Sequence, residues 1–192
     1  MNARCAIAIR TAPWLLLAAG LALNAGCSRS TYVYVKQDAY SPQLPENLNV
    51  YRGAAVHLAG FTNRAENTSM FYYYSPDYSV TYEGAPSLQS YLWYCFEKAL
   101  SSLGMKVYSG EDNPPVEVPE LQLTFTSLTD QEFKFEAAVL EGNQQVFKNS
   151  YAIAAPPPKQ QKPAALEQRA YRMVDAAVDA LLSDPKFQQS LY

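Results

Sequence analysis

The alternation of apolar and polar residues predicts a body built from short strands and two helices. A short apolar run at residues 54–61 is typical of a buried strand. Aromatic and β-branched residues fill segments 70–74 and 78–82, on either side of a Ser-Pro-Asp sequence at 75–77. Strand-forming residues that flank a turn sequence indicate a β-hairpin.

Two longer segments have apolar residues at the 3.6-residue spacing of an amphipathic helix. The first is residues 87–103, and Gly104 after it suits a helix C-terminus. Its apolar stripe consists of Leu88, Leu92, Cys95, Phe96, Ala99 and Leu103. The second is residues 164–182, which follows a proline-rich spacer at 156–163 and is ended by Asp184-Pro185.

Strand patterns also follow the first helix. A short strand is expected at 105–108, and three alternating segments at 121–128, 133–137 and 145–153 predict an antiparallel meander. Each helix has a single apolar stripe, so each should lie on a sheet. We therefore predict an α+β fold, with a mainly antiparallel sheet and two amphipathic helices packed on one face.

The N-terminus resembles a bacterial lipoprotein leader. Residues 1–10 contain Arg4 and Arg10 and no acidic residue, and an apolar run leads to Leu23-Asn24-Ala25-Gly26-Cys27. This sequence is similar to a lipobox, although Asn24 stands where Leu is usual. The resemblance implies that residues 1–26 are removed and that Cys27 is acylated. An ordinary cleaved leader and a membrane-spanning anchor are the alternatives, but a span needs about 20 apolar residues, more than this run offers.

The residues after Cys27 are polar and contain two prolines, apart from a strand-like alternation at 32–35. We expect residues 27–49 to be the acylated cysteine and a flexible tether, and residues 50–192 to be a single periplasmic domain. Ser28 follows the cysteine. In the resembling lipoproteins an Asp there retains the protein in the inner membrane, so the resemblance implies the outer membrane, facing the periplasm.

Composition excludes several classes of partner and site. The chain has 15 Lys and Arg against 18 Asp and Glu, and loss of the leader makes it more acidic. We therefore expect no nucleic-acid partner, because nucleic acids require clustered cations. Of the three cysteines only Cys95 would remain as a thiol, so no internal disulfide is expected.

Candidate catalytic chemistry is sparse. His57 is the single histidine and lies in an apolar strand, and Cys95 lies on the apolar stripe of the first helix. A structural role is favoured for both, and a Cys–His nucleophile pair is the alternative. No metal-ligand spacing, phosphate loop or nucleophile motif accompanies them. We predict no enzyme activity, no cofactor and no metal site.

Aromatic residues give the candidate partner surface. Residues 32–94 contain 11 of the 15 tyrosines, and tyrosine-rich surfaces often bind proteins. Tyrosine also suits half-exposed strands with no partner. On a helical wheel Trp93 lies off the apolar stripe beside Leu100, and this pair is either covered by the tyrosine hairpin or available to a partner. The candidate surface consists of Trp93, Tyr72, Tyr74, Tyr78 and Leu100.

The order of these features resembles a known family, the ABC-type transport auxiliary lipoproteins, which includes the periplasmic lipoprotein of the Pqi system. The likeness spans residues 50–183, and its most specific pieces are Tyr74-Ser75-Pro76-Asp77-Tyr78 and Ala99-Leu100-Ser101-Ser102-Leu103-Gly104. It implies a non-catalytic docking component of a lipid transport system, with protein partners and a lipid anchor in the membrane. A structural lipoprotein of an outer-membrane assembly or secretion complex is the alternative, and such proteins often form homo-oligomers.

Overall fold

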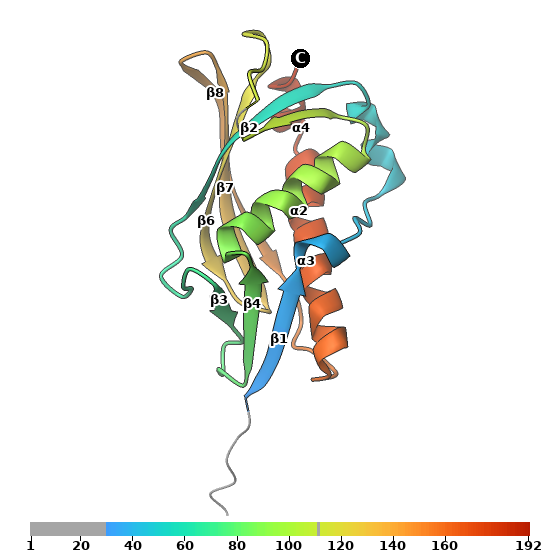
Figure 1. Cartoon of the computed structure of the whole chain (residues 1–192). Helices are drawn as coiled ribbons and strands as arrows, with labels where there is room; N and C mark the ends of the chain where they lie inside the picture. The colour runs from blue at the N-terminus through green and yellow to red at the C-terminus, as the bar shows by residue number, and fades with distance from the viewer. Residues whose placement is uncertain (1–29, 111) are drawn as a thin grey trace, which may run out of the picture.

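A computed structural model describes residues 30–110 and 112–192 (Figure 1). The expected leader at 1–26 and Cys27 lie outside the described residues. Two sheets and two long helices make up the body, and the larger sheet carries both helices on the same face.

The larger sheet has five strands in the order β5-β2-β6-β7-β8. Their bounds are β2 (Ala55–Asn63), β5 (Lys106–Ser109), β6 (Glu120–Leu128), β7 (Glu132–Glu141) and β8 (Gln144–Ala154). Strands β6, β7 and β8 form the predicted antiparallel meander. Strand β2 is parallel to both of its neighbours, β5 and β6.

The smaller sheet has three strands in the order β1-β4-β3, namely β1 (Thr31–Lys36), β4 (Val80–Ala85) and β3 (Tyr72–Tyr74). The predicted hairpin is confirmed, because β3 and β4 pair antiparallel across the turn. Strand β1 comes from much earlier in the chain and adds to β4 in parallel. A single bridge between Tyr74 and Thr129 connects the hairpin to the end of β6.

Helices α2 (Leu88–Ser102) and α3 (Pro163–Leu182) lie where the periodicity predicts them. The side chain of Ser87 accepts a hydrogen bond from the amide of Ser90 and caps α2, and Gly104 after the helix has a φ of 79°. Helix α2 packs against β2, β4 and β5, and α3 packs beside it against β1, β7 and β8. A short helix α4 (Pro185–Gln189), which the periodicity did not predict, begins at the capping residue Asp184.

The α+β class with helices on one sheet face is therefore confirmed, and the sheets are mixed rather than purely antiparallel. Parallel pairs need long crossover connections, and alternation within a strand does not reveal them.

The tether expected at 27–49 is wrong from Thr31 onward. This segment forms β1, the 3₁₀ helix η2 (Gln37–Ala39) and the 3₁₀ helix η3 (Glu46–Tyr51). It is held by five buried side chains, Val33, Val35, Tyr40, Leu48 and Tyr51. The hydroxyl of Tyr51 donates to the carbonyl of Leu182 (2.5 Å), which joins the segment to the end of α3. Only the alternation at 32–35 is periodic, and Tyr40, Leu48 and Tyr51 are isolated apolar residues that the sequence pattern does not mark as buried.

A candidate docking surface of tyrosines

The pleat of the smaller sheet places four tyrosines on its outer face. Side chains alternate between the faces of a strand, and on β1 Val33 and Val35 are buried while Tyr32 and Tyr34 are 50% and 43% exposed. On β3 the central Tyr73 is buried, which leaves Tyr72 and Tyr74 on the other face.

Strand register arranges these tyrosines in two rows. Tyr32 of β1 and Tyr74 of β3 both stand beside Thr81 of the central strand β4. Tyr34 and Tyr72 both stand beside Glu83. We call these six residues the tyrosine face: Tyr32, Tyr34, Tyr72, Tyr74, Thr81 and Glu83.

A fifth tyrosine extends this face at the hairpin turn. Tyr78 is 69% exposed, and its ring lies 5.5 Å from the ring of Tyr74. The turn is fixed by Asp77, whose Oδ1 accepts hydrogen bonds from the hydroxyls of Ser75 (2.7 Å) and Ser79 (2.8 Å). These hydrogen bonds lower the pKa of Asp77 to about 2, so it stays ionised at any physiological pH.

The opposite face of the smaller sheet packs tightly into the core. The rings of Tyr73 and Tyr82 stack at 4.6 Å with an interplanar angle of 7°. The hydroxyl of Tyr82 donates to the buried carboxylate of Asp130 (3.1 Å). This packing gives the tyrosine face a rigid base, and a rigid base lowers the entropic cost of binding a partner.

The structure thus brings together three of the residues expected in a partner surface, Tyr72, Tyr74 and Tyr78. It adds Tyr32 and Tyr34, which the sequence analysis placed in the tether. The apolar-polar alternation at 32–35 was the available signal for them.

Leu100 does not belong to any surface, and its prediction as a surface residue is wrong. Its side chain is 0% exposed. Helix α2 packs on the sheet and on α3 at once. A helix with two packing partners buries a wider part of its circumference than the single apolar stripe that a helical wheel predicts.

Trp93 is half-buried and packs against the core from the flank of α2. It lines a separate cleft of about 350 Å³ together with Tyr94, Glu97 and Ser109, residues of α2 and β5. Strand β4 separates the hairpin turn from the start of α2 by six residues, or about 20 Å of extended chain. Neither Tyr72, Tyr74 nor Tyr78 lines this cleft, so Trp93 is not part of the tyrosine face.

His57 and Cys95 lie on opposite sides of the larger sheet. Val56 and Leu58 of β2 face the core, so His57 between them faces away from it. Cys95 is buried on α2, on the core side, and burial raises the pKa of its thiol well above the usual range. A Cys–His nucleophile pair does not form.

Two carboxylates are buried in the body and both hydrogen-bond a tyrosine. Asp175 accepts from the hydroxyl of Tyr40 (2.7 Å) and from the amide of Gln43 (3.2 Å). Burial raises the pKa of both Asp130 and Asp175. Asp175 connects the N-terminal segment to α3, and Asp130 connects the hairpin to the larger sheet. Both carboxylates therefore have a structural role.

Within residues 30–110 and 112–192, no group of three His, Cys, Asp or Glu side chains is placed to hold a metal ion. None of the helices in the described part of the chain combines the length and the apolar character that crossing a membrane requires.

Comparison with known proteins shows similarity in fold alone. No family model and no curated protein matches the sequence. The structure resembles that of protein XCC0632 from Xanthomonas campestris, which carries the family label DUF330, with a TM-score of 0.60 and 12% identity over 83% of this chain and 97% of that one. It also resembles an uncharacterized protein, with a TM-score of 0.50 and 15% identity over 80% of this chain and 99% of that one. The chain thus shares its α+β fold with solved proteins whose descriptions name no activity.

Proposed function

We propose that this chain is a lipoprotein anchored through Cys27 to the outer membrane, where it faces the periplasm and acts as a non-catalytic docking component of an ABC-type lipid transport system. The observation that carries the proposal is the tyrosine face, which lies next to the point where the chain leads back to Cys27.

The start of the described chain is fixed to the hairpin. The amide of Thr31 donates to the carbonyl of Ser79 (2.8 Å), and the hydroxyls of Ser30 and Thr81 lie 3.3 Å apart. Cys27 precedes Ser30 by three residues, which span at most about 11 Å. An acyl group on Cys27 would therefore hold the hairpin turn close to the membrane surface.

The chemistry of the tyrosine face favours a protein partner over the lipid interior. Glu83 stands at the centre of one row between Tyr34 and Tyr72, and a carboxylate is costly to bury in hydrocarbon. Tyrosine is enriched in protein interfaces, because its ring supplies contact area and its hydroxyl can hydrogen-bond. A membrane-embedded transport component would meet this face at the height that the short anchor allows.

Site-specific photo-crosslinking in native cells tests this assignment. A crosslinking amino acid replaces Tyr72 or Tyr34 on the tyrosine face, and a matched control replaces Ser150 on β8. We expect Tyr72 and Tyr34, but not Ser150, to crosslink to a component of a membrane transporter that is identified by mass spectrometry. Equal crosslinking from all three positions, or none from the tyrosine face, would contradict the proposal.

The anchor is tested separately by the intact mass of the protein recovered from native membranes. We expect loss of residues 1–26 and a mass increase on Cys27 that corresponds to acylation. An unmodified Cys27, or a retained leader, would overturn the anchoring.

The alternative function, a structural lipoprotein of an assembly or secretion complex, predicts different crosslinks. Its partner would be a second copy of this chain or an assembly component rather than a transporter.

A further inference from the structure

We propose that a second site, a cationic cleft at the anchored end of the body, binds the phosphate group of an anionic lipid headgroup. The cleft lies between the proline-rich segment 156–160 and the first turns of α3, and its volume is about 400 Å³. The inference rests on the proposed anchoring at Cys27, which brings the cleft to the membrane.

One wall of the cleft is a single face of α3. Ala165, Arg169 and Arg172 line it, and their spacing of four and then three residues places them above one another on the helix. The other wall is Pro156 to Pro158 followed by Lys159 and Gln160. Three cationic side chains therefore border one hollow, while the prolines supply an apolar flank.

Arg169 fixes the shape of the cleft. Its Nε and Nη2 donate to the carbonyl of Asp130 (2.8 and 2.6 Å), and Nη2 also donates to the carbonyl of Pro156. The amide of Ala155, the residue just before Pro156, donates to the carbonyl of Gln131 (2.9 Å) and holds the same end of the segment. The start of the proline segment is thereby held against α3, which fixes where this wall of the cleft begins.

The cationic groups of Arg172 and Lys159 are available to bind an anion. The two ion pairs within the described residues are Lys134–Glu132 and Lys148–Glu136, so neither cation of the cleft is paired with a carboxylate there. Arg169 interacts electrostatically with the buried Asp130, and Arg172 with the buried Asp175. Each of these carboxylates accepts a hydrogen bond from a tyrosine hydroxyl. Guanidinium and ammonium groups that converge on a small hollow suit a phosphate.

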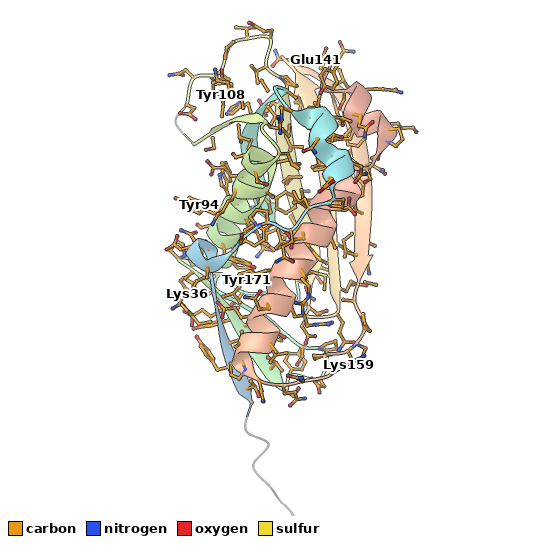
Figure 2. The ribbon with its side chains drawn as sticks, turned by 90° about the vertical axis from the view of Figure 1, so that its right-hand side faces the viewer. Lys36, Tyr94, Tyr108, Glu141, Lys159 and Tyr171 are labelled. Carbon is orange, nitrogen blue, oxygen red and sulfur yellow. The ribbon has the colours of Figure 1, made fainter. Side chains whose placement is uncertain are left out.

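The position of the cleft points to a lipid as the source of the phosphate. Lys159 lies at the end of the body where β1 begins, together with the start of α3 (Figure 2). Ser30, just before β1, is three residues after Cys27, a reach of at most about 11 Å. Headgroup phosphates of the anchoring membrane thus lie within reach of the cleft. A site for free phosphate would have no reason to lie at this end of the body.

Calorimetric titration of the full chain in dodecyl maltoside tests the site. The three probes are dihexanoyl phosphatidylglycerol, dihexanoyl phosphatidylcholine and inorganic phosphate. We expect phosphatidylglycerol to bind most tightly and inorganic phosphate to compete for the same site. Lys159→Gln and Arg172→Gln should each weaken phosphatidylglycerol binding about fivefold, while Lys186→Gln on α4, at the other end of the molecule, should leave it unchanged.

Binding of inorganic phosphate without phosphatidylglycerol would overturn the lipid assignment. Binding that the double variant Lys159→Gln/Arg172→Gln leaves intact, or no binding of any probe, would overturn the site. The proposed transporter docking is tested separately, because crosslinking from Tyr72 does not require Lys159 or Arg172. Both variants replace exposed side chains that have no hydrogen-bond partner within the described chain, so folding is expected to be retained.

Discussion

Replacement of Gly84 by alanine tests the close contact between β4, the central strand of the tyrosine face, and the first turn of α2. Gly84 lies in β4, and a Cβ built there would lie 2.9 Å from Cα of Leu88 and 3.3 Å from Cβ of Tyr91. Carbon atoms in favourable contact lie about 3.5–4.0 Å apart. The first turn of α2 would therefore have to move away from β4 by about 1 Å, because a backbone atom cannot rotate aside.

Overpacking of this kind costs about 1–3 kcal/mol. In a domain of this size 1 kcal/mol changes the melting temperature by about 2–4 °C, so we expect Gly84→Ala to lower it by about 2–12 °C. The matched control is Gly60→Ala in β2, where the nearest atom to the new Cβ is Cγ of Gln122 at 3.9 Å. Alanine in a strand is favoured over glycine by about 0.5–1 kcal/mol, so the control should keep or raise the melting temperature.

Circular dichroism melts of both variants and the parent chain give the measurement. A Gly84→Ala variant as stable as the Gly60→Ala control would refute the close approach of β4 and α2. The same variant should also weaken crosslinking from Tyr72, because β4 is the central strand of the tyrosine face.

Three further predictions concern buried groups. Tyr40→Phe removes the hydroxyl that donates to Asp175 and should lower the free energy of unfolding by about 1–3 kcal/mol in urea titrations; a loss below 0.5 kcal/mol would show that water replaces the hydroxyl. The pKa of Asp130 is higher in the folded chain than its unfolded value of 3.8. Protonation of Asp130 therefore stabilises the fold below pH 3.8, and this contribution is lost as the pH rises through the pKa of the folded state. The free energy of unfolding of Asp130→Asn, relative to that of the parent chain, should therefore be higher at pH 7 than at pH 4. An equal difference between the two proteins at both pH values would contradict this. The raised pKa of the Cys95 thiol predicts that a thiol reagent labels it, as located by peptide mass spectrometry, only when denaturant unfolds the chain; rapid labelling of the native protein would refute its burial.

Elements that carry a complete local pattern could be predicted from the sequence. Helix α3 has a polar face and an apolar face over 20 residues, and strands β6 and β7 of the meander alternate between more and less buried positions along most of their length. In both cases the hydrophobic period itself determines which side chains are buried. Ser87 and Gly104 added the capping signals that delimit α2.

Elements that depend on distant partners could not be predicted. Strand β1 is stabilised by pairing with β4, about 50 residues later, and by the contact of α3 with its other side. The hydroxyl of Tyr171 on α3 donates to the carbonyl of Lys36 (2.8 Å) at the end of β1. The alternation at 32–35 indicates a short strand, but nothing within residues 31–36 identifies its distant partners, so the sequence alone predicts that this strand belongs to a tether.

The same long-range pairing changes what the proposed anchor would do. A flexible tether of 20 residues would let the body move roughly 25 Å from the membrane, and a partner would then find the tyrosines at any height. With β1 inserted beside β4, the free chain after Cys27 shortens to three residues. Under the proposed anchoring, the body would be held with the hairpin turn and the cationic cleft facing the bilayer, and the tyrosine face would stand at a set height above it. The pairing of β1 with β4 therefore supplies two of the four tyrosines of the tyrosine face, and with the proposed anchor it would also fix the distance of that face from the lipid.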